Sequence, residues 1–133
     1  MEPSVLFSLR LSVQVAAFAT ALVLIAGIPA AYLLARRDFA MRELVDALIT
    51  LPLVLPPTVT GYYLIVLLGR NGLVGNVLHQ WTGFTVMFTW QAAVIASAVV
   101  ALPLMVKTAR AAIESVDRNL IDASATLGHS ELW

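Results

Sequence analysis

The sequence predicts an all-α polytopic membrane protein with three transmembrane helices. Of its 133 residues, 60% are hydrophobic and 12% are charged, and the mean hydropathy is +0.89. Soluble domains have roughly 45 to 50% apolar and about 25% charged residues. Long uncharged segments separate the charges into short clusters. The formal net charge is zero, and no basic stripe indicates nucleic-acid binding.

The first predicted span covers residues 11–35. At about 1.5 Å per residue it is long enough to cross a hydrocarbon core of roughly 30 Å. A cleaved signal peptide is the alternative, but its apolar region has only about 7 to 15 residues and follows positive charge. Here Arg36 and Arg37 come after the apolar run, which favours a retained helix. The stretch GIPA, residues 27–30, predicts a kink in this helix.

The second predicted span, residues 47–69, contains three prolines in the stretch LPLVLPPTVTGYYL. Each proline lacks an N–H group and crowds the carbonyl group four residues earlier. Irregular backbone at membrane depth is tolerated where protein or water satisfies it, and the hydroxyl groups of Thr50, Thr58 and Thr60 are within local reach. We therefore expect a broken helix that lines a translocation path or gate, with an ordinary kink as the alternative. The residues assigned to this path are Pro52, Pro56, Pro57, Thr58, Thr60 and Gly61.

The third predicted span covers residues 84–106. The preceding stretch NGLVGNVLHQWTG, residues 71–83, is rich in Gly and polar side chains, so we expect a loop with an interfacial turn. Trp81 and Trp90 are expected near a headgroup layer, as is typical of tryptophan in membrane proteins.

The number of Lys and Arg residues alternates between the four segments outside the spans. In chain order the segments contain one, three, one and three of them. They are Arg10; Arg36, Arg37 and Arg42; Arg70; and Lys107, Arg110 and Arg118. By the positive-inside rule, the N-terminus is predicted outside and the first loop and the tail in the cytoplasm. No Asp, Glu, Lys or Arg falls inside a span, so the sequence does not support ion-coupled transport.

The tail, residues 107–133, is predicted to continue the third helix as far as Arg118. Glu114 precedes Arg118 by four residues, in the favourable order for an ion pair on a helix. Asp117 or Asn119 can then cap a new short helix, and Gly128 suits its C-terminal end. Ser130 can cap a second helix that begins with Glu131.

The short helix carries an apolar stripe with small residues in its middle, formed by Leu120, Ala123, Ser124 and Leu127. Asp122 lies early enough to favour the positive end of the helix dipole. Such a stripe fits a groove on a partner protein. A membrane-surface helix is the alternative, but the short length and the acidic and small residues count against it.

These residues resemble the permease subunits of bacterial ABC importers. The stretch DASATLG, residues 122–128, is similar to the start of their shared loop, which reads Glu-Ala-Ala, three residues, Gly. Asp122 stands for the Glu, Ala123 and Gly128 match, and Ser124 replaces the second Ala. The stretch LPLVLPPTVTGYYLIVLLGRNGLVG, residues 51–75, is similar to that of molybdate permeases.

The resemblance implies the N-terminal half of a type I importer permease of the bacterial inner membrane. Residues 107–133 would be the coupling region, and its contact residues would be Leu120, Asp122, Ala123, Ser124, Leu127 and Gly128. Two permease copies would enclose a path for molybdate, which a periplasmic oxyanion-binding protein delivers. The chain has no GxxxxGK[ST] motif and is expected to be no enzyme by itself, so ATP would be used by a separate cytoplasmic ATPase.

Several alternatives stay open at this point. The cargo can be another oxyanion, such as tungstate, sulfate or thiosulfate. A small self-associating pore or a structural membrane protein is a different class of function. No cofactor or metal site is expected in this chain, which has no cysteine and two histidines. Because the sequence stops at Trp133, before two further helices of the family, residues 1–133 are expected to form one domain that is incomplete at its C-terminus.

Overall fold

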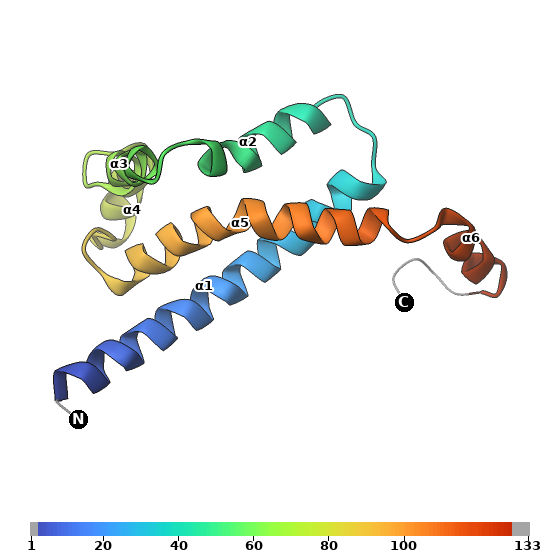
Figure 1. The fold of residues 1–133 in the computed structure, drawn as a ribbon. Coiled ribbons are helices and arrows are strands. Elements are labelled where there is room, and N and C mark those ends of the chain that lie inside the picture. Colours follow the sequence, from blue (N-terminus) through green and yellow to red (C-terminus); the bar gives the residue numbers. More distant parts are fainter. Residues whose placement is uncertain (1–2, 129–133) are drawn as a thin grey trace.

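The computed structural model describes residues 3–128, and within this range the chain is helical with no strand (Figure 1). The helices are α1 (Pro3–Arg36), α2 (Arg42–Val54), α3 (Pro57–Leu68), α4 (Leu73–Thr82), α5 (Trp90–Glu114) and α6 (Arg118–Thr126). By length and composition, α1 and α5 can each cross a membrane. A third crossing results if α2 and the segment after it form one bent span. The predicted all-α polytopic membrane fold is therefore confirmed, with two or three crossings.

The core of the described chain lies between α1 and α5, which form its main helix pair (Figure 1). Ala31, Leu34 and Val106 are almost fully buried there. Gly27 allows a close approach, because a Cβ atom at this position would lie 3.1 Å from Cγ of Met105. Small residues serve this purpose in many membrane helix pairs. The core therefore holds the last part of α1 against the second half of α5.

The first helix is longer than the predicted span of residues 11–35, since α1 extends from Pro3 to Arg36. Its 34 residues correspond to about 51 Å, well above a hydrocarbon core of roughly 30 Å. The helix continues through Pro29 and through Arg10. A helix of this length can place Arg10 beyond the hydrocarbon, so the charge does not end it.

The second span, predicted at residues 47–69, is broken. Leu55 and Pro56 are not helical and separate α2 from α3. The helix direction changes by 113° between α2 and the segment Pro57–Thr82. In Figure 1 this turn lies at the upper left, where α3 is seen almost along its axis. The structure thus contains a sharp break where the prolines predict one, rather than a slight kink.

The expectation of a loop over residues 71–83 is wrong, because most of this stretch forms α4. The reason is the spacing of Gly69, Gly72 and Gly75, at which the start of α4 lies close against the end of α3. A Cβ atom at Gly75 would overlap the backbone of Gly69 and Leu68. Glycine was interpreted as a loop signal, whereas here it permits two helices to pack backbone against backbone.

The third span begins later than predicted. It was expected at residues 84–106, but α5 begins at Trp90 and extends to Glu114. The side chain of Thr89 caps its start by accepting a hydrogen bond of 3.4 Å from the backbone N–H of Ala92. The ring of Trp90 lies against that of Phe18 on α1, with 5.3 Å between the ring centroids. The predicted helical continuation beyond residue 106 is confirmed as far as Glu114.

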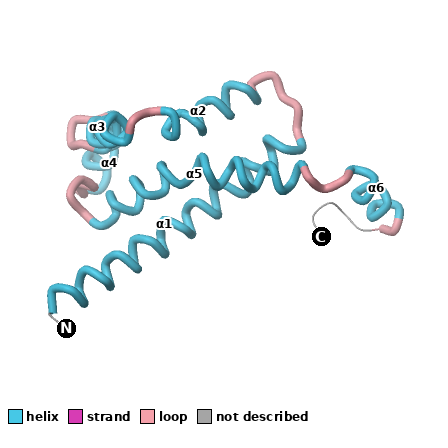
Figure 2. Tube along the Cα trace, in the orientation of Figure 1, coloured by secondary structure: helices cyan, strands magenta, loops and turns pink. Residues whose placement is uncertain are grey.

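The short tail helix forms as α6, joined to α5 by the loop drawn in pink in Figure 2. Of the two predicted caps, Asp117 is the one that caps it, by accepting a hydrogen bond of 2.9 Å from the N–H of Asn119. Gly128 follows its end with a φ of +86°, a conformation that suits glycine. In Figure 1, α6 projects beyond the packed helices. The second helix expected from Ser130 and Glu131 lies outside the described residues.

Candidate functional site

The three prolines occupy different positions around the break. Pro56 is the N-cap of α3, and Pro57 is its first residue, where a missing N–H removes no helical hydrogen bond. Pro52 lies inside α2 and deprives the carbonyl of Leu48 of its helical donor. The break itself therefore comes from Pro56 and Pro57.

One of the three threonines satisfies backbone at the break. The hydroxyl of Thr60, a buried residue, donates to the carbonyl of Pro56 at 3.4 Å. The same carbonyl accepts hydrogen bonds from the backbone N–H groups of Val59 and Thr60, at 2.9 and 3.1 Å. Thr50 instead donates to the carbonyl of Asp46 at 2.6 Å, which lies at the other end of α2. Thr58 is exposed.

An apolar cavity of about 510 Å³ lies beside the break. Its walls come from α2, α3 and α5, and they are Leu51, Pro52, Leu55, Thr60, Tyr63, Leu64, Val66, Leu67 and Val99. Two of the six predicted path residues, Pro52 and Thr60, line it. Pro56, Pro57 and Thr58 are exposed and Gly61 is half-buried, so the structure does not gather all six on one wall.

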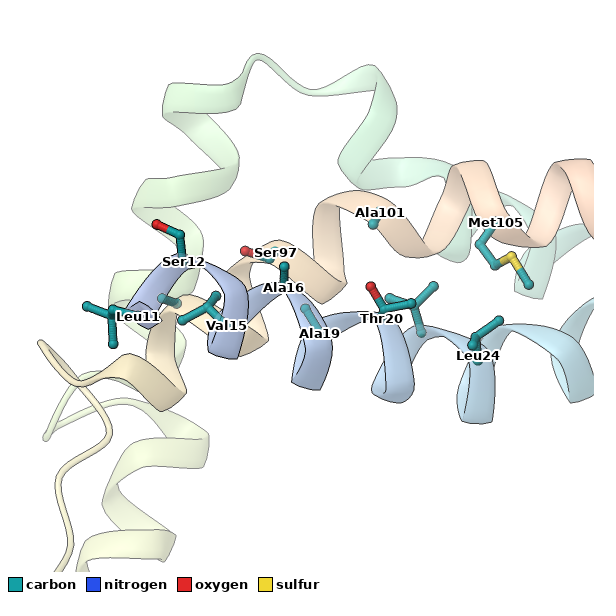
Figure 3. A pocket seen from close by; sticks show the side chains of 12 residues that line it. Leu11, Ser12, Val15, Ala16, Ala19, Thr20, Leu24, Ser97, Ala101 and Met105 are labelled. Carbon is teal, nitrogen blue, oxygen red and sulfur yellow. The ribbon is translucent and has the colours of Figure 1, made fainter. Parts of the chain in front are cut away.

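A second groove, of about 630 Å³, lies between α1 and α5 and was not predicted (Figure 3). Its lining is mostly small, and it includes Ser12, Ala16, Ala19, Thr20, Ala93, Ser97 and Ala101. Small residues four apart on α1 and again on α5 were the sequence signal for this groove. Faces of this kind permit close packing between membrane helices.

Charged side chains join α2 to α5 at the end of the helix pair that is predicted to be cytoplasmic. Arg110 donates to Glu114 through Nε at 2.8 Å, and its Nη1 lies 3.6 Å from Oδ1 of Asp46. Arg42 reaches Oε1 of Glu114 at 3.5 Å and Oδ1 of Asp38 at 2.7 Å. The cluster thus spans the first loop, α2 and α5.

The predicted ion pair between Glu114 and Arg118 is wrong. Glu114 is the last residue of α5, whereas Arg118 is the first residue of α6, so the two do not share a helix face. The carboxylate of Glu114 turns to Arg110 and Arg42 instead. The pairs Asp38–Arg42 and Arg110–Glu114 have the local i,i+4 spacing, but the contacts between α2 and α5 join residues more than 60 positions apart, which no local spacing rule relates.

The stripe predicted on α6 is open to the surroundings. Leu120 and Leu127 are 67% and 80% exposed, and Ala123 is exposed as well. Ser124 is half-buried and its hydroxyl donates to the carbonyl of Ile121 at 2.8 Å. An apolar stripe exposed on a short, capped helix is typical of a docking surface.

Asp122 lies on another face of α6, toward the last residue of α1. It lines a small cavity of about 200 Å³ together with Arg36, Arg118 and Ile121. Arg36 also donates to the carbonyl of Ile113 in the last turn of α5, at 3.3 Å. Arg36 therefore connects the end of α1 with the end of α5, close to the start of α6.

Known proteins match the chain over most of its length. Residues 24–133 match the family described as binding-protein-dependent transport system inner membrane component. The molybdenum transport system permease protein ModB of Haemophilus influenzae is 47% identical over 123 residues, which are 92% of this chain and 53% of that protein. ModB of Escherichia coli K12 is 47% identical over 118 residues, 89% of this chain and 52% of that protein.

A more distant relative, ModB of Azotobacter vinelandii, is 37% identical over 123 residues, 92% of this chain and 54% of that protein. The chain spans about half the length of the curated relatives it matches. The family match covers both α5 and α6 and the broken span between α1 and α5. The chain therefore belongs to the family of binding-protein-dependent transport system inner membrane components.

Proposed function

We propose that this chain forms part of the permease subunit of an ATP-driven importer that moves molybdate across the bacterial cytoplasmic membrane. The similarity to ModB proteins at 47% identity supports molybdate as the cargo. Family membership supports a separate binding protein, and we infer that it delivers the oxyanion on the outer side. Two copies of the permease enclose the path.

The exposed stripe on α6 is the main structural support for a permease that is driven by a partner protein. The stripe follows α5 after a loop of three residues, and α5 contacts both α1 and α2. A force applied to α6 by a cytoplasmic ATPase can therefore pass through α5 to α1 and α2 as a rigid-body movement. A self-associating pore needs no such element, so this alternative is less consistent with the structure.

The break between α2 and α3 is our candidate for the path or gate. Its cavity is lined mainly by apolar side chains, and such a surface cannot replace the water around a multiply charged oxyanion. We therefore assign the wet side of the break to Pro56, Pro57 and Thr58, which are exposed. The cavity side, with Pro52 and Thr60, is assigned to packing that supports the bend.

Orientation follows the charge distribution. We propose an external N-terminus, with the first loop and α6 in the cytoplasm. ATP hydrolysis belongs to the partner ATPase, because the sequence has no phosphate-binding GxxxxGK[ST] motif.

The cargo is tested by uptake in cells that lack the intact gene. Uptake of radioactive molybdate should return with the intact gene and should be inhibited by excess unlabelled molybdate. Tungstate, sulfate and thiosulfate are added as competitors in parallel. If sulfate or thiosulfate competes as well as molybdate does, the cargo assignment is wrong.

Docking through α6 is tested with two matched variants of the intact permease. Ala123→Glu places a charge on the stripe, whereas Ala125→Glu makes the same change at an exposed position off the stripe. We expect the first variant to lose copurification with the ATPase and the second to keep it. Equal behaviour of the two variants would refute the assignment of the stripe.

A further inference from the structure

Four charged residues, which we call the charge ladder, face each other across α2 and α5. Arg42 and Asp46 lie one helical turn apart on α2, and Arg110 and Glu114 lie one turn apart on α5. Arg42 faces Glu114 at 3.5 Å, and Asp46 faces Arg110 at 3.6 Å. Each helix thus contributes an arginine followed by an acidic residue, and opposite charges face each other because the two helices run antiparallel here.

This arrangement favours one register of the two helices. If α5 moved by one turn along α2, either the two arginines or the two carboxylates would come to face each other. Like charges at close range oppose such a shift, and they do so strongly where water is partly excluded. The ladder residues on α2 are shielded, with side chains 27% and 31% exposed.

Apolar packing alone does not fix this register. Val45 and Ile49 of α2 pack against the core formed by Ala31, Leu34 and Val106. The hydrophobic attraction behind these contacts is non-directional. Charged pairs are directional, so the ladder adds the resistance to sliding that the apolar contacts lack.

The two ion pairs between α2 and α5 are also longer than a charged hydrogen bond usually is. Oδ1 of Asp46 is buried and has no hydrogen bond to any described residue, while its partner on Arg110 lies at 3.6 Å. Both distances between the helices exceed the 2.7 to 2.9 Å that is usual for charged hydrogen bonds. A small approach of α2 to α5 therefore lowers the free energy of the buried carboxylate.

We propose that the charge ladder makes α2 follow α5, so that a displacement of α6 reaches the break at Leu55 and Pro56. This inference rests on the proposed function of the chain. On one side of the ladder, α6 follows Glu114 after three residues. On the other side, α2 extends from Asp46 to the break over about 12 Å of helix. The four residues are positioning residues, which act through α2 on the gate.

The test uses the intact permease in complex with its ATPase and measures molybdate uptake per ATP hydrolysed. Arg110→Glu should lower this ratio about tenfold, within the usual range of coupling between sites. The inverted ladder combines Arg42→Glu, Asp46→Arg, Arg110→Glu and Glu114→Arg with Asp38→Arg, because Asp38 pairs with Arg42 at 2.7 Å. It should restore most of the ratio because every one of these pairs is again of opposite sign. Arg37→Glu, an exposed reversal outside the ladder, should leave it unchanged.

Restoration by the inverted ladder separates a register role from a general loss of stability. If Arg110→Glu prevents assembly, the neutral variant Arg110→Gln is assayed and should lower the ratio severalfold. Two results would overturn this proposal if the unmodified protein transports molybdate. One is an unchanged ratio of uptake to ATP hydrolysis in the assembled variants. The other is a failure of the inverted ladder to restore that ratio. A lack of molybdate uptake by the unmodified protein would overturn the proposed function and this inference together.

Discussion

The glycines between α3 and α4 offer the sharpest test of how the broken span is built. Gly75 is buried in α4 against the end of α3. In Gly75→Ala, the new Cβ atom would lie 2.7 Å from the carbonyl carbon of Leu68 and would overlap two backbone oxygens. This distance is about 0.8 Å short of ordinary contact between two carbon atoms.

Relief of this overlap requires α4 to move away from α3, because the opposing atoms belong to backbone and cannot rotate aside. Overpacking of this kind lowers the free energy of unfolding by roughly 1 to 3 kcal/mol, and by more where the new atom meets backbone atoms. We expect about 3 kcal/mol of destabilisation, less the roughly 0.5 to 1 kcal/mol gained from the better helix propensity of alanine.

Gly61→Ala is the matched control. Gly61 lies inside α3, and a Cβ atom there would meet nothing within 4 Å. This variant should be neutral or more stable by roughly 0.5 to 1 kcal/mol, because alanine favours the helix. Thermal or detergent unfolding of the two purified proteins compares them directly. If Gly75→Ala is as stable as Gly61→Ala, the close packing at the junction of α3 and α4 does not stabilise this part of the chain.

Three further predictions concern the α6 cap, the orientation and the path. Asp117→Ala removes the cap of α6 and should lower the local stability of this helix by about 1 kcal/mol. Amide hydrogen exchange in α6 should then be roughly fivefold faster. Unchanged exchange would exclude a capping role. Asn71→Cys should react with an impermeant maleimide in intact cells and Arg37→Cys only after permeabilisation, whereas reaction from one side in both variants would make the bent pair a re-entrant loop. Thr58→Cys should react with a water-soluble thiol reagent during turnover, and complete protection throughout would place the path elsewhere.

Local signals in the sequence were sufficient for several elements. The apolar runs predicted both long helices, and the three prolines Pro52, Pro56 and Pro57 predicted a break in the middle span. Asp117 predicted the start of α6, because capping depends on atoms two or three residues apart. Such interactions depend only on residues that are close in the sequence, so they form in any fold that is compatible with them.

Other features required contacts between distant segments. The helix α4 was predicted as a loop, since its glycines are loop signals unless another backbone lies against them. The start of α5 was predicted too early because the apolar residues before Trp90 are not helical. For the site, the sequence named six path residues, but the structure places Pro52 and Thr60 in the cavity and leaves others exposed.

The sequence by itself determined that this chain is a helical membrane protein with a broken middle span and a capped tail helix. These properties follow from hydrophobicity, proline geometry and local capping, which act over a few residues. The tertiary structure alone decided that Glu114, besides its pair with Arg110 in the same helix, reaches Arg42 of α2 rather than Arg118. The physical reason is that an ion pair depends on distance in space, and the ends of α5 and α2 come together only when the helices pack.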